Sequence, residues 1–343
     1  MASHAGIATF VAMIRPGVSR SRLRAIVTVL LVAASIVAFA SCSGDRGPRG
    51  TTTSTPEASR SGSPTASSPA STPSASGAVP GRCTPSRCPG LPVPTAELMT
   101  GAITRDNAPQ KVSGYLTSVL DDLDSTWTPW FRELGWGDPA PGRVLVEAGD
   151  TYRSGCEDAD GAIVVTSDTP NAFFCGVDKA RDGGGTRVEG SLILPVEAFV
   201  GIWTGTFLVQ GPLDSIGGFQ GEFTAATVVA HEYGHAVVDR IVRAGHLPDS
   251  RRPRGENSEL IADCLAGNWA ATVLRRDELS VTDIVQAVTL IQKIGDPEPG
   301  QGHGTSTQRI AAISRGFFGR SVNGGGQGQP IGCLTEYWPE EFG

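Results

Sequence analysis

The stretch His231-Glu232-Tyr233-Gly234-His235 decides how the rest of the chain is interpreted, because it places two histidines four residues apart. On an α-helix this spacing advances about 6 Å and turns slightly more than once, so both imidazoles project from the same face. Two neutral imidazoles in that position can bind one zinc ion from one side. Glu232 lies next to the first histidine and can reach a water molecule on the metal without ligating it. The stretch therefore predicts one half of a zinc site.

Two acids on the following predicted helix can supply the other half. Glu259 and Asp263 are also four residues apart, so they share a helix face. One carboxylate can complete a site of two histidines and one acid, which leaves the fourth zinc position to water. The other can accept the free ring N–H of a ligand histidine. A solvated helix face is the alternative, but the surrounding sequence is largely apolar and would make bare acids costly. We therefore expect one Zn²⁺ ion.

A site built from three histidines, as in the metzincins, does not fit the chain. That pattern requires a glycine three residues and a histidine six residues after the second histidine. Val238 and Ile241 occupy those positions. His246 lies further along, in a predicted loop, and is a weaker candidate ligand than Glu259.

The folded domain is predicted to run from about residue 98 to 343 and to belong to the α+β class, mainly helical with a small antiparallel sheet. Helical spacing of apolar residues, and short apolar runs bounded by turn signals, locate the elements. Strands are expected at 143–147, 162–166, 172–175 and 191–194. Helices are expected at 112–134, 195–213, 221–244, 256–275, 282–294 and 305–315.

Residues 1–42 have the pattern of an export signal. Four arginines precede a continuous apolar run at 25–41. The run ends in small residues before Cys42, as in the lipobox of bacterial lipoproteins, although Phe39 replaces the usual Leu or Val. Lipidation of Cys42 would hold the chain on the outer side of the cell membrane. An uncleaved anchor and a plain secretory signal are the alternatives, and all three predict an extracytoplasmic protein.

Residues 43–97 are rich in Ser, Thr and Pro and contain few large apolar side chains. Such a segment cannot bury enough surface to offset its ordering entropy, so we expect a disordered linker that gives the folded domain reach. The chain carries a net charge of −7 without a basic run, which argues against nucleic acid as a partner. The expected partners are a peptide or protein substrate and the membrane.

The cysteines support an oxidising compartment. With Cys42 set aside for lipid, six of the seven cysteines remain, and an even number in an exported chain favours disulfides. No CxxC pair is present, which disfavours cysteine ligands for the metal. Proximity along the chain predicts the pairs Cys83–Cys88 and Cys156–Cys175, which leaves Cys264–Cys333.

Together these motifs resemble the bacterial neutral zinc metallopeptidases of the YpfJ-like family, in the gluzincin clan. The resemblance is carried by Gly-Glu-Phe at 221–223, by the 231–235 motif and by Glu-Leu-Ile-Ala-Asp-Cys-Leu-Ala-Gly at 259–267. A weaker match begins at His303. The resemblance implies a zincin-like catalytic domain that uses one zinc ion to hydrolyse peptide bonds.

The resemblance also implies a role for each site residue. It makes His231, His235 and Glu259 the zinc ligands, Glu232 the general base and Asp263 the partner of a ligand histidine. Gluzincins commonly bring a distant His or Tyr to the oxyanion, and His303 is the candidate here. Capping of the following helix is an equal alternative for His303. We expect Arg309 to pair with an acid, Gly234 to permit close helix packing, and Trp269 to lie in the core.

The sequence therefore predicts an exported, membrane-tethered zinc metallopeptidase. The alternative from another class is a non-catalytic cell-envelope lipoprotein whose zinc is structural and which serves as a binding or assembly module. Glu232 disfavours that alternative, because a purely structural site has no use for the acid. A zinc hydrolase directed at a cell-wall amide is a second rival.

Overall fold

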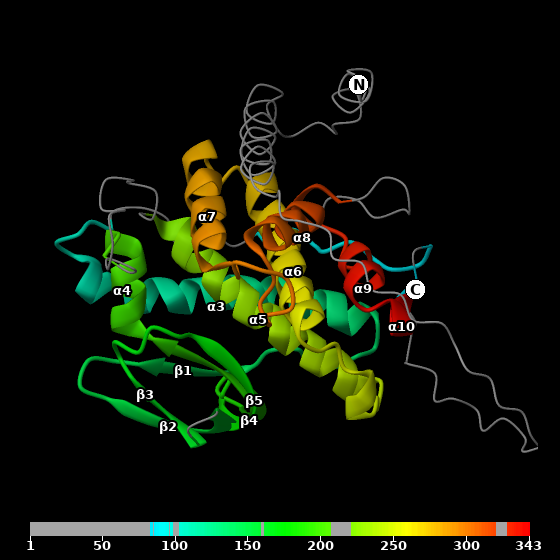
Figure 1. Ribbon diagram of the computed structural model, residues 1–343, viewed down its shortest axis with the longest axis horizontal. Coiled ribbons are helices and arrows are strands. Elements are labelled where there is room, and N and C mark those ends of the chain that lie inside the picture. Colours follow the sequence, from blue (N-terminus) through cyan, green and yellow to red (C-terminus); the bar gives the residue numbers. More distant parts are fainter. Residues whose placement is uncertain are drawn as a thin grey trace, which may run out of the picture.

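Figure 1 shows the arrangement of the chain in a computed structural model. The structure describes residues 83–84, 86–95, 97–98, 103–158, 161–206, 221–319 and 328–343. The predicted export signal, Cys42 and most of the predicted linker lie outside these residues. Among the helices that are described, none combines the length and hydropathy needed to cross a membrane.

The described helices pack around one central pair, α5 and α6. The helices are α3 (Ala108–Glu133), α4 (Val196–Thr204), α5 (Glu222–Ala244), α6 (Glu256–Arg275), α7 (Val281–Ile294), α8 (Ser306–Phe318), α9 (Ile331–Tyr337) and α10 (Pro339–Phe342), with a short 3₁₀ turn at Asp249–Arg251. Every residue of α6 from Leu260 to Leu274 is buried, and α5 is buried over most of its length. The prediction of a helix at 256–275 is confirmed to the residue.

Aromatic side chains join α3 to the central pair. Trp269 on α6 is fully buried, as expected, and stacks on Phe223 at the start of α5 with the ring centroids 5.8 Å apart. Its indole N–H donates to the Oδ2 atom of buried Asp122 on α3, at 2.7 Å. The Arg276 guanidinium also binds this carboxylate. The buried polar atoms of Trp269 and Asp122 are thus satisfied, and α3 is joined to both helices of the central pair.

The sheet corrects the prediction of one antiparallel sheet. Strands β1 (Gly142–Val146), β5 (Arg187–Pro195) and β4 (Phe173–Arg181) form a three-stranded sheet in the order β1-β5-β4, and β2 (Thr151–Asp158) pairs with β3 (Gly161–Thr166) in a second, two-stranded sheet. β4 is antiparallel to β5, but β1 is parallel to it. The long crossover through β2, β3 and β4 permits this parallel pairing. The sequence did not predict β2, because its residues are mostly polar and exposed and so lack the apolar pattern of a strand.

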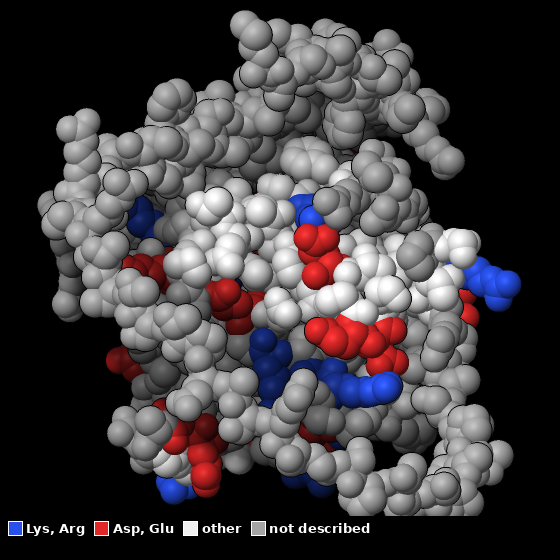
Figure 2. All heavy atoms as spheres, turned by 45° about the vertical axis from the view of Figure 1, so that its right-hand side comes forward, with Lys and Arg blue, Asp and Glu red and all other residues white. Residues whose placement is uncertain are grey.

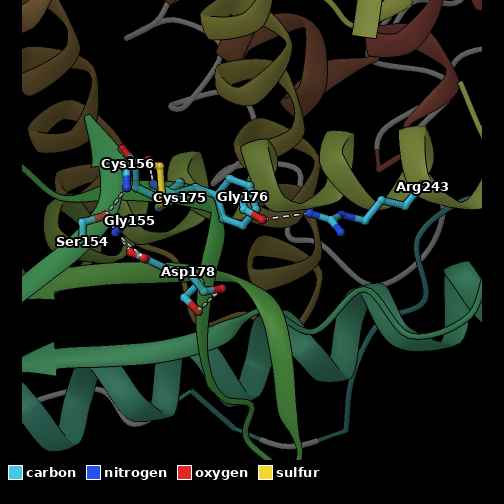
Figure 3. Close-up of a disulfide and its surroundings, with 10 residues drawn as sticks. Ser154, Gly155, Cys156, Cys175, Gly176, Asp178 and Arg243 are labelled. Atoms are coloured by element: carbon cyan, nitrogen blue, oxygen red, sulfur yellow. Dashed lines mark hydrogen bonds between the residues drawn. A yellow bond between two sulfur atoms is a disulfide. The ribbon is translucent and has the colours of Figure 1, made fainter. Parts of the chain in front are cut away.

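Three disulfides brace the fold, and all three predicted pairs are confirmed. Cys83 is bonded to Cys88 near the start of the described chain, and Cys264 on α6 to Cys333 on α9. The third bond joins Cys156 on β2 to Cys175 on β4, and so links the two sheets (Figure 3). Phe174, the residue before Cys175, donates its backbone N–H to Glu232 on α5.

Helices α5 and α6 approach most closely at Gly234. A Cβ atom added there would lie 2.8 Å from the Cα and 2.9 Å from the carbonyl oxygen of Ala262, both of which are backbone atoms that cannot turn away. The expectation that this glycine permits close packing is confirmed. The contact matters for function, because it sets the distance between the histidines on α5 and the acids on α6.

The variant Gly234→Ala is therefore expected to lose about 1–3 kcal/mol of unfolding free energy and to bind zinc more weakly, because α6 must move away. Urea denaturation and a zinc titration measure the two effects. Gly114→Ala on α3 is the matched control. An added Cβ at Gly114 meets nothing within 4 Å, so this variant should be neutral or stabilised. Equal destabilisation by both substitutions would contradict the packing argument.

Candidate metal centre

Three side chains from α5 and α6 converge on one point. The His231 Nε2 atom is 3.2 Å from His235 Nε2 and 3.3 Å from Glu259 Oε2, and His235 Nε2 is 3.5 Å from Glu259 Oε1. A tetrahedral zinc ion with bonds of 2.0–2.1 Å separates its ligand atoms by about 3.3 Å. The observed separations fit this value. Two imidazoles and one carboxylate are the donor set of catalytic zinc sites, so the group fits zinc.

Asp263 lies behind His231 and orients it. The Oδ1 atom of Asp263 is 2.8 Å from His231 Nδ1, on the side of the ring away from the convergence point. Arg309 on α8 donates to the same carboxylate through Nε at 2.8 Å and Nη2 at 2.9 Å. Asp263 is 1% exposed and Arg309 is 4% exposed. Arg309 was expected to pair with an acid, and that acid is Asp263. The buried Asp263 carboxylate is thus paired with His231 on one side and Arg309 on the other.

The electrostatics of the metal-free group place a proton on one histidine. Burial lowers the pKa of His231, but the Asp263 charge and hydrogen bond outweigh it and raise the pKa to about 10. Burial, together with the charge on His231, lowers the pKa of His235 to about 4. Although burial opposes it, the hydrogen bond from His231 lowers the pKa of Glu259 to about 2. A metal ion at His231 Nε2 must displace a proton, so zinc binding should strengthen as pH rises.

Glu232 lies beside the group and is held by the edge of the sheet. It is 8% exposed, and its Oε2 atom accepts a hydrogen bond from the backbone N–H of Phe174 on β4, at 3.1 Å. Burial raises the pKa of Glu232 to about 7, against the opposing charge on His231. A carboxyl group with a pKa in this range can accept and return a proton near neutral pH.

The group opens into a cleft of about 1050 Å³. Its lining includes all four site residues, His231, Glu232, His235 and Glu259. β4 contributes Phe173, Phe174, Gly176 and Val177, and α4 and α7 contribute apolar side chains. This volume is slightly above the range of about 300–1,000 Å³ that is usual for ligand pockets. The cleft therefore has room for a substrate that extends well beyond the metal ligands.

His303 lines the same cleft but points largely into solvent. Its side chain is 65% exposed, and its Nδ1 atom is 3.3 Å from Asp296 Oδ1. Helix α8 is capped by Thr305, whose hydroxyl accepts from the Gln308 N–H, so the capping alternative for His303 is wrong. Its role at the oxyanion stays a prediction. His246 lies just after α5 and outside the converging group.

Two features of the site have no signal in the sequence. The Phe174 N–H that holds Glu232 is a backbone group 58 residues away along the chain. Arg252 also lines the cleft, because its guanidinium binds Asp239 on α5. The position of Asp239 could have been predicted, because it continues the four-residue spacing from His231 through His235 and so lies on the same helix face.

Comparison with known proteins agrees with the motifs. Residues 212–324 match the sequence model of a family described as "Putative neutral zinc metallopeptidase". The chain is 25% identical, over 253 residues, to "Uncharacterized protein YpfJ" of Escherichia coli K12 and to the protein of the same description from Escherichia coli O6:H1. The aligned part covers 68% of this chain and 75% of each relative. No solved structure matches the chain. The predicted family resemblance is thus confirmed, and the matched residues include the three candidate ligands.

Proposed function

We propose that the chain is a zinc metallopeptidase that hydrolyses peptide bonds in the cleft between α5 and β4. The observation that carries the proposal is Glu232, a buried carboxyl group that lines the cleft directly beside the converging ligands. The family match over 212–324 supports the reaction class. The α+β arrangement, with both histidines on one central helix, supports a gluzincin-like domain.

Zinc bound by His231, His235 and Glu259 would supply Lewis acidity, which polarises a carbonyl group and makes water more acidic. The residues of the chain do the rest. Glu232 takes the proton from the attacking water at its carboxylate and returns it to the leaving amine. The Phe174 N–H holds the Oε2 atom of Glu232, so the carboxylate keeps one orientation during both transfers. Asp263 keeps Nδ1 of His231 protonated and Nε2 available.

Two observations favour catalysis over the structural-zinc alternative. A structural zinc site is closed by four protein ligands, whereas the group in the described part of the chain contains three. The open side faces a cleft instead of packed side chains. A binding module with a structural site would need neither the open position nor Glu232.

We also propose that the domain acts outside the cytoplasm, tethered to the membrane through Cys42 or released by secretion. The export pattern of residues 1–42 supports this location. The three disulfides support it independently, because such bonds persist in oxidising compartments. The linker at 43–97 would then let the domain reach substrates away from the membrane surface.

Removal of zinc is expected to abolish peptide cleavage and to leave the fold intact, because the buried core packs α5 against α6 without the metal. Hydrolysis of a fluorogenic peptide mixture and circular dichroism are measured before chelation, after it, and after zinc is added back. Activity that survives complete zinc removal would refute the proposal. Loss of the helical signal on chelation, with no hydrolysis at any stage, would identify the zinc as structural.

A further inference from the structure

The cleft runs along one face of α5 and is much longer than the metal site. The α5 residues that line it are Thr227, Val228, His231, Glu232, His235, Val238, Asp239 and Arg243. From the first to the last of these, the helix rises about 24 Å, at 1.5 Å per residue. An extended peptide covers that distance with about seven residues. A peptide bound across the metal site therefore meets both ends of the cleft.

The end of the cleft near the start of α5 is apolar. It is lined by Ala198, Phe199 and Ile202 of α4 and by Leu290, Ile291 and Ile294 of α7. Figure 1 shows both helices on the side where α5 begins. Two contacts agree with this view for α4, because Tyr115 packs on Trp203 of α4 and also donates its hydroxyl to the Glu222 carbonyl. For α7, Gln286 lies against Gly221, the residue before α5. This end suits large apolar side chains.

The other end of the cleft is built on one buried acid. Asp239 is 1% exposed and accepts from three arginines: Arg240 Nη1 at 3.2 Å, Arg243 Nε at 2.6 Å and Arg252 Nη2 at 2.9 Å. One carboxylate cannot neutralise three guanidinium groups. Glu189 takes up part of the excess, because it pairs with Arg243, but it also pairs with Lys179. Asp249 also lines the cleft and offsets more of the charge. Within this set of ion pairs, four basic side chains (Arg240, Arg243, Arg252 and Lys179) still exceed three acids (Asp239, Glu189 and Asp249) by one, so net positive charge remains at this end.

Arg243 and Arg252 use their donors differently. All three guanidinium nitrogens of Arg243 already make a bond: Nε donates to Asp239, Nη1 to Glu189 and Nη2 to the Gly176 carbonyl on β4, next to the Cys156–Cys175 disulfide (Figure 3). Arg243 thus ties the edge strand to α5. Among the described residues, Arg252 makes only the bond to Asp239 and a 4.0 Å contact with Asp249, which is 86% exposed and screened by water.

These contacts leave one side of the Arg252 guanidinium available to a ligand. Its side chain is one-third exposed and lines the cleft. The buried Asp239 holds it in place, so little entropy is lost when it binds. A fixed guanidinium with free N–H groups is suited to a carboxylate, which it can bind through two parallel hydrogen bonds.

We propose that Arg252 binds a carboxylate of the substrate, so that the enzyme selects peptides with an acidic group at one end of the cleft and apolar residues at the other. Both an Asp or Glu side chain and a chain terminus carry this chemistry, and the test below separates them. Asp239 follows His235 by one helical turn, so the carboxylate lies about two to four residues of extended peptide from the scissile bond. This inference rests on the proposed function.

Among the described residues on the face shown in Figure 2, acidic and basic side chains lie next to one another, without a large field of one sign. Selection of an acidic group by long-range attraction to such a surface is therefore weak. The proposed preference therefore depends on a local contact such as that of Arg252, and single substitutions can test that contact.

The test is cleavage-site profiling of a peptide library by mass spectrometry, with wild type, Arg252→Gln and Arg252→Glu. Wild type should prefer Asp or Glu over Asn or Gln by about tenfold at one position, two to four residues from the cut. Arg252→Gln should lose that preference, and Arg252→Glu should favour Lys or Arg there. Peptides that end in a free acid or an amide separate a terminal carboxylate from a side chain.

Arg251→Gln is the matched control, because Arg251 pairs with Glu341 and is not part of the cleft lining. It should keep the wild-type preference. Capture of uncleaved library peptides by zinc-loaded Glu232→Gln protein, with and without Arg252→Gln, measures selection without turnover. Acid-selective capture without any cleavage by wild type would refute the peptidase and keep the carboxylate site. An acidic preference absent from both assays, or unchanged in Arg252→Gln, overturns the inference.

Discussion

Replacement of Glu232 by glutamine is expected to lower kcat for peptide hydrolysis by at least about 10²-fold, the usual contribution of a general base, while zinc stays bound. The amide cannot accept a proton from water, but its oxygen can still accept the Phe174 N–H, so the side chain keeps its place. The metal ligands His231, His235 and Glu259 are untouched. The measurement is kcat and KM on a fluorogenic peptide, with zinc content determined by atomic absorption.

Glu157→Gln provides the control for this substitution. Glu157 lies on the exposed face of β2, away from the cleft lining, and the same change of charge there should leave kcat unaltered. Hydrolysis by Glu232→Gln at the wild-type rate would show that another group accepts the proton, and the mechanism proposed here would fail. Loss of zinc from the variant would instead mean that Glu232 supports the metal.

The second large effect is expected at Asp263. Asp263→Asn should lower the unfolding free energy by about 3–5 kcal/mol, because it leaves the buried Arg309 guanidinium without its counter-charge. The same substitution weakens the partner of His231 Nδ1, so zinc affinity should fall by about 10–100-fold. Urea denaturation of the zinc-free protein measures the first effect, and competition with a zinc chelator measures the second.

Asp121→Asn tests whether burial is the cause. Asp121 pairs with Arg143 at 2.6 Å but its side chain is 62% exposed, so its loss should cost about 1 kcal/mol or less. A double-mutant cycle of Asp263→Asn with Arg309→Met then isolates the buried pair. Removal of both charges should cost less than the sum of the single changes. Equal losses from Asp121→Asn and Asp263→Asn would refute the assignment.

The features that sequence alone predicted well are those with a local physical cause. The helical period defines α6 to the residue, and it puts residues four apart on one face, which is why both pairs of site residues could be identified. Two of the disulfides followed from an even cysteine count and short separations, and the third, between cysteines 69 residues apart, was the pair that remained. The strand β2 and the parallel pairing of β1 had no such local signal, and both were missed.

From the residues themselves, the sequence determined that His231 shares a helix face with His235 and that Glu259 shares one with Asp263, since helix geometry alone brings each pair together. Only the tertiary structure decided how the acids are used. The close approach of α5 and α6 at Gly234 brings Glu259 to the two Nε2 atoms and buries Asp263 behind His231. It also brings Arg252 to Asp239. Such contacts depend on how helices and strands pack across long sequence separations, which local periodicity does not encode.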